Sequence, residues 1–189
     1  MRPNRLICSI LLLIALLQTY SCHIPHDKEI ICYSNLEKAR TLMFKMPTDT
    51  SSLDSALVLL NRSIQCDSIK TAVVDLKIRL LIALGKFNEG SQFVDSLAKT
   101  DFVFPYKKKL SHDNFIALNY QANKDINSRN LTYQLMVSDL SLYINNNSLN
   151  PNEFEDAFSD LYTIKSNFVD TLTINREIDS LQTIYPNNK

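Results

Sequence analysis

The chain has 189 residues, and its 20 lysines and arginines balance 20 aspartates and glutamates, so the formal net charge is zero. A nucleic-acid-binding protein needs a basic excess to displace counterions from phosphates, so this balance argues against that class. Hairpin turns and phosphate-binding loops both use several glycines, whereas this chain has only Gly85 and Gly90. P-loops and dinucleotide-binding motifs are therefore excluded, and the composition favours a helical domain.

Residues 1–21 have the pattern of a signal peptide. Arg2 and Arg5 precede an apolar run over residues 6–17. This run is too short to cross a hydrocarbon core of roughly 30 Å, which takes about 20 residues in a helix. A positive start followed by a short apolar core is instead typical of a secretory signal.

The end of this segment places a small residue, Ser21, directly before Cys22. The junction resembles the lipobox of bacterial lipoproteins, although Thr19 stands where that family prefers leucine. The resemblance implies that the signal is cleaved after Ser21, that Cys22 is acylated, and that residues 22–27 form a tether. Three acyl chains would anchor the protein firmly, since one chain alone is marginal. Ordinary signal cleavage after Ser21 is the alternative.

A triplet of Asp, then Ser or Thr, then a small aliphatic residue occurs five times, which is more often than the composition predicts by chance. The triplet resembles the O-glycosylation acceptor of one phylum of Gram-negative gut bacteria, and it implies an extracytoplasmic location. Alternatively, Asp-Ser pairs occur because they suit helix starts. The five candidate acceptor hydroxyls belong to Ser55, Ser68, Ser96, Thr171 and Ser180.

Two cysteines remain once Cys8 leaves with the signal and Cys22 carries lipid. Cys32 and Cys66 each lie 17 residues from the turn expected near Asp49, so an antiparallel helical hairpin would bring them level. Helix axes lie about 8–10 Å apart and a disulfide needs Cα atoms within about 7 Å, so the pair would have to face each other squarely. A disulfide and two buried free thiols are both compatible with the sequence.

Apolar periodicity predicts eight helices, with prolines at positions 47, 105, 151 and 186 between the periodic runs. The expected helices span residues 28–46, 52–66, 70–84, 87–99, 106–122, 126–146, 151–166 and 171–185. In the seventh and just beyond its end, the apolar positions are Phe154, Ala157, Phe158, Leu161, Ile164 and Phe168. Short loops between successive helices predict antiparallel neighbours.

An internal repeat relates residues 52–60 to residues 86–94 at a spacing of 34 residues. The matched pairs are Leu53 with Phe87, Ala56 with Gly90, and Leu60 with Val94. This spacing, with a large residue three before a tiny one, resembles the tetratricopeptide repeat. The resemblance covers residues 37–102, with Ser68 and Lys77 departing from the pattern. It implies that residues 28–189 form a right-handed solenoid of helical hairpins; a plain helical bundle is the alternative.

The sequence offers little chemistry. His23 and His26 belong to the tether, and His112 lies beside Asp113, where a solvent-exposed position is the simpler interpretation. No His and Cys set has zinc spacing, and the glycines needed for a nucleophile elbow are missing. We therefore expect no enzyme activity, no catalytic or metal-ligating residue, no cofactor and no small-molecule substrate.

Charged residues in two other places are interpreted as solvated helix faces. One is the basic run over residues 107–109. The other consists of the carboxylate pairs Glu153/Glu155 and Asp156/Asp160, for which general acid–base catalysis is much the weaker hypothesis.

The repeat resemblance implies a concave groove that binds a protein partner, lined by the first helix of each unit. The candidate groove residues are Lys45, Asp75, Arg79, Ile82, Lys109 and Asp113, with Thr41 and Thr48 beside Lys45 in the first unit. Both charge signs occur among them. Asparagine is absent from these positions, which disfavours the clamp that some repeat proteins use for a peptide's C-terminal carboxylate.

Taken together, these features predict a lipid-anchored, non-catalytic protein at the outer membrane of a Gram-negative bacterium, on its periplasmic or cell-surface face. Its expected function is to hold a protein partner there as a scaffold or assembly factor. The alternative is an immunity protein that neutralises a toxin delivered by a rival cell. Tight neutralisation depends on electrostatic complementarity with one cognate surface, so it would be the more sensitive of the two to charge changes.

Overall fold

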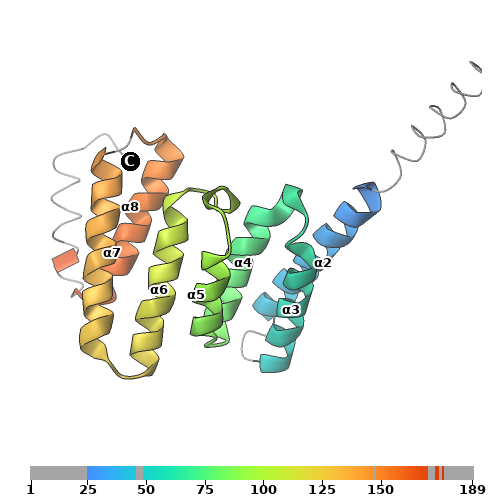
Figure 1. Cartoon of the computed structure of the whole chain (residues 1–189), viewed down its shortest axis with the longest axis horizontal. Coiled ribbons are helices and arrows are strands. Elements are labelled where there is room, and N and C mark those ends of the chain that lie inside the picture. The colour runs from blue at the N-terminus through green and yellow to red at the C-terminus, as the bar shows by residue number, and fades with distance from the viewer. Residues whose placement is uncertain (1–24, 46–48, 147, 170–172, 175, 177–189) are drawn as a thin grey trace, which may run out of the picture. The chain divides into compact units, whose positions relative to one another are not determined.

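The computed structural model describes residues 25–45, 49–146, 148–169, 173–174 and 176 (Figure 1). This part of the chain holds seven α-helices and two short 3-10 helices, with no strand. The all-helical prediction is thus confirmed, whereas the helix count is seven rather than eight. The expected helix over 171–185, like the signal peptide and Cys22, lies almost wholly outside the described residues. No helix in the described part is both long and apolar enough to cross a membrane.

By its internal contacts the chain divides into two compact units, residues 1–80 and 81–189. The first contains α2 (Pro25–Lys45), α3 (Thr50–Ser63), the 3-10 helix η1 (Asp67–Ile69) and most of α4 (Lys70–Ala83). Helices α2 and α3 lie side by side, as the short connection between them requires (Figure 1). Their buried side chains include Leu36, Ala39, Ala56 and Leu60.

Helix α3 begins at Thr50 because Asp49 caps it. The Asp49 carboxylate accepts a hydrogen bond from the backbone N–H of Ser51 at 3.1 Å and another from the Ser52 hydroxyl at 2.5 Å. Such a cap satisfies backbone donors that have no partner within the helix. The hydrogen bond from Ser52 also lowers the pKa of Asp49 below its ordinary value.

Cys32 on α2 and Cys66 just before η1 are joined by a disulfide, with their Cα atoms 6.5 Å apart. Both residues are buried. Beside them, the fully buried Ser63 hydroxyl donates to the backbone oxygens of Cys32, at 3.3 Å, and of Leu59, at 3.1 Å. The bond and the hydroxyl therefore tie α2 to the C-terminal end of α3.

The second unit contains α5 (Phe87–Asp95), the 3-10 helix η2 (Lys99–Asp101), α6 (Tyr106–Ala122), α7 (Ile126–Asn146) and α8 (Pro151–Lys165). Each of these helices packs beside the next in the chain, as the ribbon shows (Figure 1). The bounds of α6 and α7 are those expected from the sequence. Helix α8 begins where Asn150 accepts a hydrogen bond from the backbone N–H of Glu153 and Pro151 takes the first helical position.

Helix α5 ends at Asp95, four residues earlier than expected. The Ser96 hydroxyl donates to the carbonyl of Phe93 at 2.6 Å, and the Asp101 carboxylate accepts from the backbone N–H of Ala98 at 2.9 Å. These polar side chains offer the backbone local alternatives to a further helical turn. The loop that follows runs over α6 and supplies one edge of the site described below.

At Gly90, α5 packs tightly against α6. A Cβ atom on Gly90 would lie 2.2 Å from Cε1 of Phe115, whose side chain is fully buried. The repeat resemblance predicts a tiny residue at this position, and the structure shows that the Phe115 ring occupies the space. Gly85, in the turn before α5, has a different reason to be glycine, since its φ is +67°.

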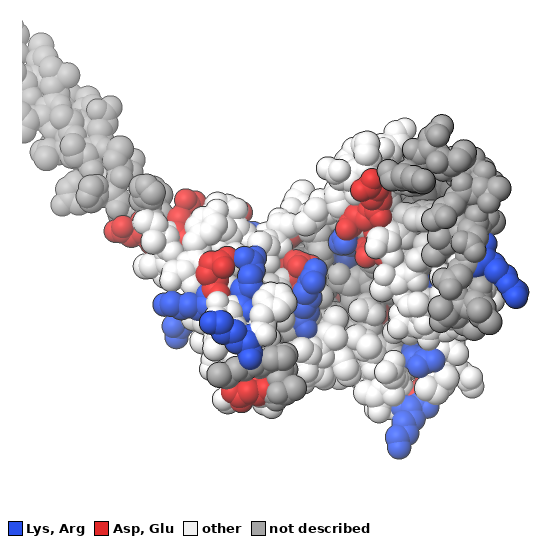
Figure 2. Space-filling model, turned by 180° about the vertical axis from the view of Figure 1, so that it is seen from behind, with Lys and Arg blue, Asp and Glu red and all other residues white. Residues whose placement is uncertain are grey.

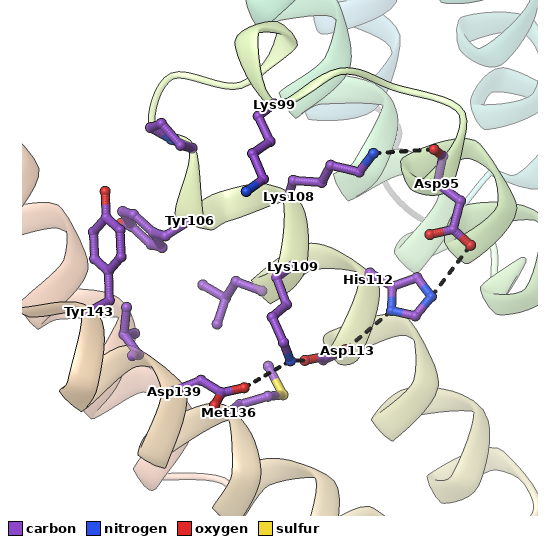
Figure 3. A pocket seen from close by; sticks show the side chains of 13 residues that line it. Asp95, Lys99, Tyr106, Lys108, Lys109, His112, Asp113, Met136, Asp139 and Tyr143 are labelled. Carbon is purple, nitrogen blue, oxygen red and sulfur yellow. Dashed lines mark hydrogen bonds and ion pairs between the residues drawn. The ribbon is translucent and has the colours of Figure 1, made fainter.

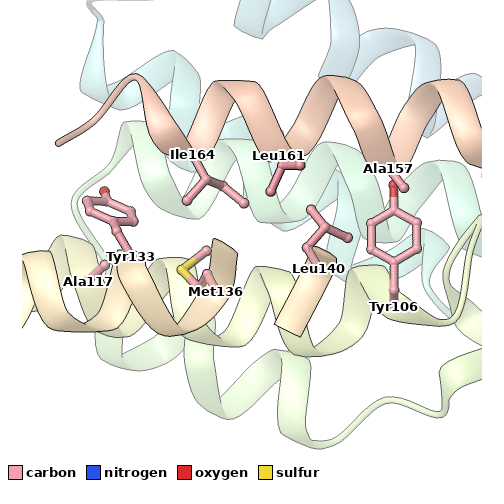
Figure 4. Close-up of a cluster of buried hydrophobic side chains, with 8 residues drawn as sticks. All are labelled: Tyr106, Ala117, Tyr133, Met136, Leu140, Ala157, Leu161 and Ile164. Carbon is pink, nitrogen blue, oxygen red and sulfur yellow. The ribbon is translucent and has the colours of Figure 1, made fainter. Parts of the chain in front are cut away.

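The core of the second unit joins α6, α7 and α8 (Figure 4). Its buried members are Tyr106, Ala117, Tyr133, Met136, Leu140, Ala157, Leu161 and Ile164. The apolar face predicted for α8 is partly wrong, because Phe154 is 41% exposed. Phe154, Phe158 and Tyr162 instead form a column of rings along the helix, with centroids 5.7 and 4.9 Å apart.

Candidate functional site

A pocket of about 450 Å³ lies within the second unit, between the loop after α5 and helices α6 and α7 (Figure 3). Its volume falls within the range of small-ligand and side-chain pockets. The residues that line it are Asp95, Lys99, Pro105, Tyr106, Lys108, Lys109, Leu110, His112, Asp113, Met136, Asp139, Leu140 and Tyr143.

The inner wall of the pocket is apolar and comes from two helices. Tyr106 and Leu110 are one helical turn apart on α6, and Met136, Leu140 and Tyr143 follow each other along one face of α7. The rings of Tyr106 and Tyr143 meet at a centroid distance of 5.1 Å in a tilted arrangement. Met136 and Leu140 are almost completely buried, so the core of the unit extends to the floor of the pocket.

The mouth of the pocket is charged, and Lys109 is at its centre. The Lys109 ammonium lies 2.5 Å from the Asp113 carboxylate on the same helix and 2.8 Å from Asp139 on α7. The hydrogen bond to Asp113, and to a smaller extent the one to Asp139, raises the pKa of Lys109. This contact joins α6 to α7 across the opening (Figure 3).

His112 extends the same network to the end of α5. One ring nitrogen, Nδ1, lies 3.1 Å from the Asp113 carboxylate, and Nε2 lies 3.5 Å from the Asp95 carboxylate. The side chain is 29% exposed. The ring is therefore half-buried and paired with two carboxylates, rather than fully exposed to solvent.

Two further lysines lie at the upper edge of the pocket. The Lys108 ammonium donates to the backbone oxygen of Asp95 at 3.2 Å and to that of Leu97, where it neutralises the carbonyl end of α5. Lys99, on η2, is exposed, and no residue in the described part of the chain makes an ion pair or hydrogen bond with its ammonium. Lys99 thus leaves a cation available at the mouth.

Behind the pocket, α8 holds the start of α6 through two carboxylates. The Tyr106 hydroxyl donates to Asp156 at 2.8 Å and to Asp160 at 2.9 Å. The Lys107 ammonium lies 2.5 Å from Asp156 and 3.1 Å from Asp160. Burial and these two acids raise the pKa of Tyr106, so its hydroxyl stays protonated and donates.

The solvated-face interpretation therefore fails for Lys107, Asp156 and Asp160, which are only partly exposed and pair with another helix, whereas Lys109 and Glu155 are exposed as expected. Burial would raise the pKa of Asp156, but hydrogen bonds from Lys107 and Tyr106 outweigh it and lower that pKa. Lys107, Lys108 and Lys109 each reach a different element, respectively α8, the end of α5 and α7. Glu153 likewise accepts a hydrogen bond from the Tyr143 hydroxyl at 2.6 Å. Burial is the main cause that raises the pKa of Tyr143 to about 12, and this hydrogen bond is the second cause.

Of the candidate groove residues, Lys109 and Asp113 lie together at the pocket. Asp75 and Arg79 pair with each other on α4 at 3.0 Å, on exposed side chains of the first unit. Lys45 ends α2, and Thr41 is exposed on the same helix. Ile82 is half-buried on α4. Thr48 lies outside the described residues.

The candidate glycosylation hydroxyls in the described part are all on exposed residues, namely Ser55, Ser68 and Ser96. The hydroxyls of Ser55 and Ser96 donate to backbone oxygens of their own helices. Thr171 and Ser180 fall outside the described residues, so their triplets stay predictions.

The described residues contain no group of three or more His, Cys, Asp or Glu side chains placed to hold a metal ion. The acids at the pocket mouth instead pair with Lys109 and His112. Such a pocket can accept an apolar side chain on its floor and a charged neighbour at its edge. Searches against protein-family models, curated proteins and solved structures find no match to this chain.

Proposed function

We propose that this chain is a non-catalytic protein-binding module, and that the pocket of the second unit receives a side chain of its partner. The observation that carries the proposal is the pairing of an apolar floor with a charged mouth. Burial of an aromatic or branched aliphatic side chain against Tyr106, Leu110 and Tyr143 would provide affinity. Lys99 at the mouth would select a partner with a carboxylate nearby.

The arrangement of the helices supports the proposal that this module is a helical-repeat protein. Successive helices of the second unit pack against their chain neighbours, and a fully buried phenylalanine fills the space left by the tiny residue of the 34-residue repeat. We propose on this basis that the helices form hairpin repeats of the tetratricopeptide type. Such repeats commonly present concave binding surfaces.

We further propose that the module is held at the bacterial envelope by lipid on Cys22, where it acts as a scaffold or assembly factor. Support comes from the signal-like residues 1–21 and from the serine–cysteine junction. Cys22→Ser should release the protein from membranes, measured by fractionation and immunoblotting. Continued membrane residence of the variant would contradict lipid anchoring.

The pocket is tested by capture of partners from gently solubilised native membranes with a tagged chain carrying Lys99→Glu. The matched control is Lys38→Glu, which makes the same charge change on an exposed residue of α2. We expect wild type and the control to capture the same protein, and the pocket variant to lose at least 90% of it, about 1.4 kcal/mol of binding free energy. Equal capture by all three chains would refute the proposal that the pocket binds the partner.

Capture of nothing from the protein's own cells would contradict the scaffold role. It would favour the alternative role, in which an immunity protein waits for a toxin from another cell. The variant pair would then be tested against candidate toxins, where Lys99→Glu should slow association if the pocket is the toxin-binding site.

A further inference from the structure

A second surface lies near the start of α2, in the first unit. Ile30, Ile31 and Tyr33 are 57%, 59% and 49% exposed, although each is a large hydrophobic side chain. The buried side of this helix carries Cys32 and Leu36. At 3.6 residues per turn, Ile30 lies on the opposite side, with Ile31 and Tyr33 on either side of it. We call these three residues the α2 patch.

The α2 patch begins on helical turns that bury little against the rest of the chain. The side chains of residues 27–31 are all exposed. Ser63, the last residue of α3, donates a hydrogen bond to the carbonyl of Cys32, so α2 extends about 10 Å past the end of α3 (Figure 1). Most of the stability of a helix in a protein comes from packing of its apolar face. An outside surface would therefore stabilise the start of α2.

The sequence places this end of the helix next to the proposed membrane anchor. Only two residues separate Cys22 from Pro25, the first residue of α2. The chain from Cys22 to Pro25 spans at most about 11 Å when extended, which is close to the diameter of one helix. With lipid on Cys22, a folded partner does not fit between the bilayer and the start of α2. The surface that this part of α2 meets first is therefore the bilayer.

We propose that the α2 patch rests on the bilayer, with Ile30 and Ile31 at the boundary of headgroups and acyl chains and the Tyr33 hydroxyl among the headgroups. Helices that lie on membranes bury apolar side chains at this depth, and tyrosine is enriched there. Because the acyl chains provide the affinity, the patch sets only the orientation of α2. This inference rests on the proposed lipid at Cys22 and not on the pocket.

The charges beside the patch fit a zwitterionic bilayer. Asp27, Lys28 and Glu29 precede the patch, so its neighbours are two acids and one base. Figure 2 shows acidic side chains and uncharged surface together where the described part of α2 begins. An anionic surface attracts basic segments and repels acidic ones, whereas the ammonium group of phosphatidylethanolamine can face a carboxylate. The lipid partner is therefore zwitterionic.

Tryptophan fluorescence can test this contact because the chain has no tryptophan of its own. The full-length Tyr33→Trp chain, purified from membranes, is reconstituted into vesicles of phosphatidylethanolamine and phosphatidylcholine. In a second preparation the phosphatidylcholine has brominated acyl chains, which quench a nearby indole. The matched control is Val58→Trp, since Val58 on α3 is 48% exposed. We expect bromination to lower the emission from position 33 about twofold and to leave position 58 unchanged.

A further variant tests whether the isoleucines hold the helix down. Adding Ile30→Ser and Ile31→Ser to the Tyr33→Trp chain should remove most of the quenching, since both apolar side chains are lost from the contact. The chain should still float with the vesicles, because the lipid on Cys22 is intact. Quenching that persists in this variant would contradict the α2 patch.

Flotation with the vesicles reports the anchor separately from the patch. A chain that floats but shows no quenching at position 33, or equal quenching at positions 33 and 58, would overturn the α2 patch and leave the lipid anchor standing. Blue-shifted emission without quenching would also overturn it, by placing residue 33 against protein such as a second copy. A chain that does not float would refute the anchor and this inference with it.

Discussion

The contact between Gly90 and Phe115 allows a quantitative test of how α5 packs on α6. Gly90→Ala would place Cβ 2.2 Å from one ring carbon and 2.3 Å from another. Carbon atoms pack best near 3.5 Å, so the ring would have to retreat by about 1.3 Å. Phe115 is fully buried, so its ring can retreat only against the residues that surround it. Overpacking of this kind costs about 3 kcal/mol at the upper end of its range.

Against this cost, alanine stabilises a helix interior by about 1 kcal/mol relative to glycine. The net expectation is a loss of about 2 kcal/mol in the free energy of unfolding, or about 4–8 °C in Tm for a chain of this size. Urea denaturation followed by circular dichroism measures the loss. Asn88→Ala, at an exposed position of the same helix, is the control and should stay within about 0.5 kcal/mol of wild type.

A second substitution separates the clash from other causes. Phe115→Leu removes the ring edge, so the Gly90→Ala/Phe115→Leu double variant should lose about 1–2 kcal/mol less than the two single losses added together. If Gly90→Ala instead stabilised the protein by about 1 kcal/mol, helix propensity alone would explain it. The close approach of α5 and α6 at this point would then be refuted.

Two further predictions concern the covalent and ionic links. Reduction of the disulfide between Cys32 and Cys66, which are 34 residues apart, should lower the free energy of unfolding by about 3–4 kcal/mol. If neither the Tm nor the intact mass changes on reduction, the disulfide is absent. Because the pKa of Asp156 is lowered in the folded state, its pairing with Lys107 stabilises the fold above the unfolded pKa of about 3.9 and is lost as the pH falls further. Wild type should therefore lose stability below pH 4 faster than Asp156→Asn; identical acid profiles would contradict this contribution.

Most of the helices could be predicted because each carries its own signals. Pro151 and Asn150 define the start of α8, and Pro105 directly precedes the first residue of α6. The end of α5 could not be predicted in the same way. It depends on the Ser96 hydroxyl and on the Lys108 ammonium, which reaches back from α6 to the last carbonyls of α5.

The sequence predicts a groove rather than this pocket. Lys109 and Asp113 are among the candidate groove residues, since they follow Asp75 and Arg79 by 34 positions. Asp139 and Tyr143 come from α7, and the sequence does not show how α7 packs on α6. One local signal was present: Tyr106, Lys109, Leu110 and Asp113 all lie on one face of a helix, which indicates a shared environment. Asp156 and Asp160 were misread because their partners are about 50 residues away in sequence.

The most direct test of the central claim, that the pocket receives a side chain of a protein partner, is site-specific photo-cross-linking in living native cells. A photoreactive phenylalanine analogue replaces Thr100, the exposed neighbour of Lys99 on η2, so that Lys99 itself is kept, and in a second chain it replaces Lys38 on α2. We predict one discrete protein adduct from position 100, identified by mass spectrometry, and none of the same mass from position 38. Identical adduct patterns from both positions, or none from position 100, would contradict a binding pocket at this site.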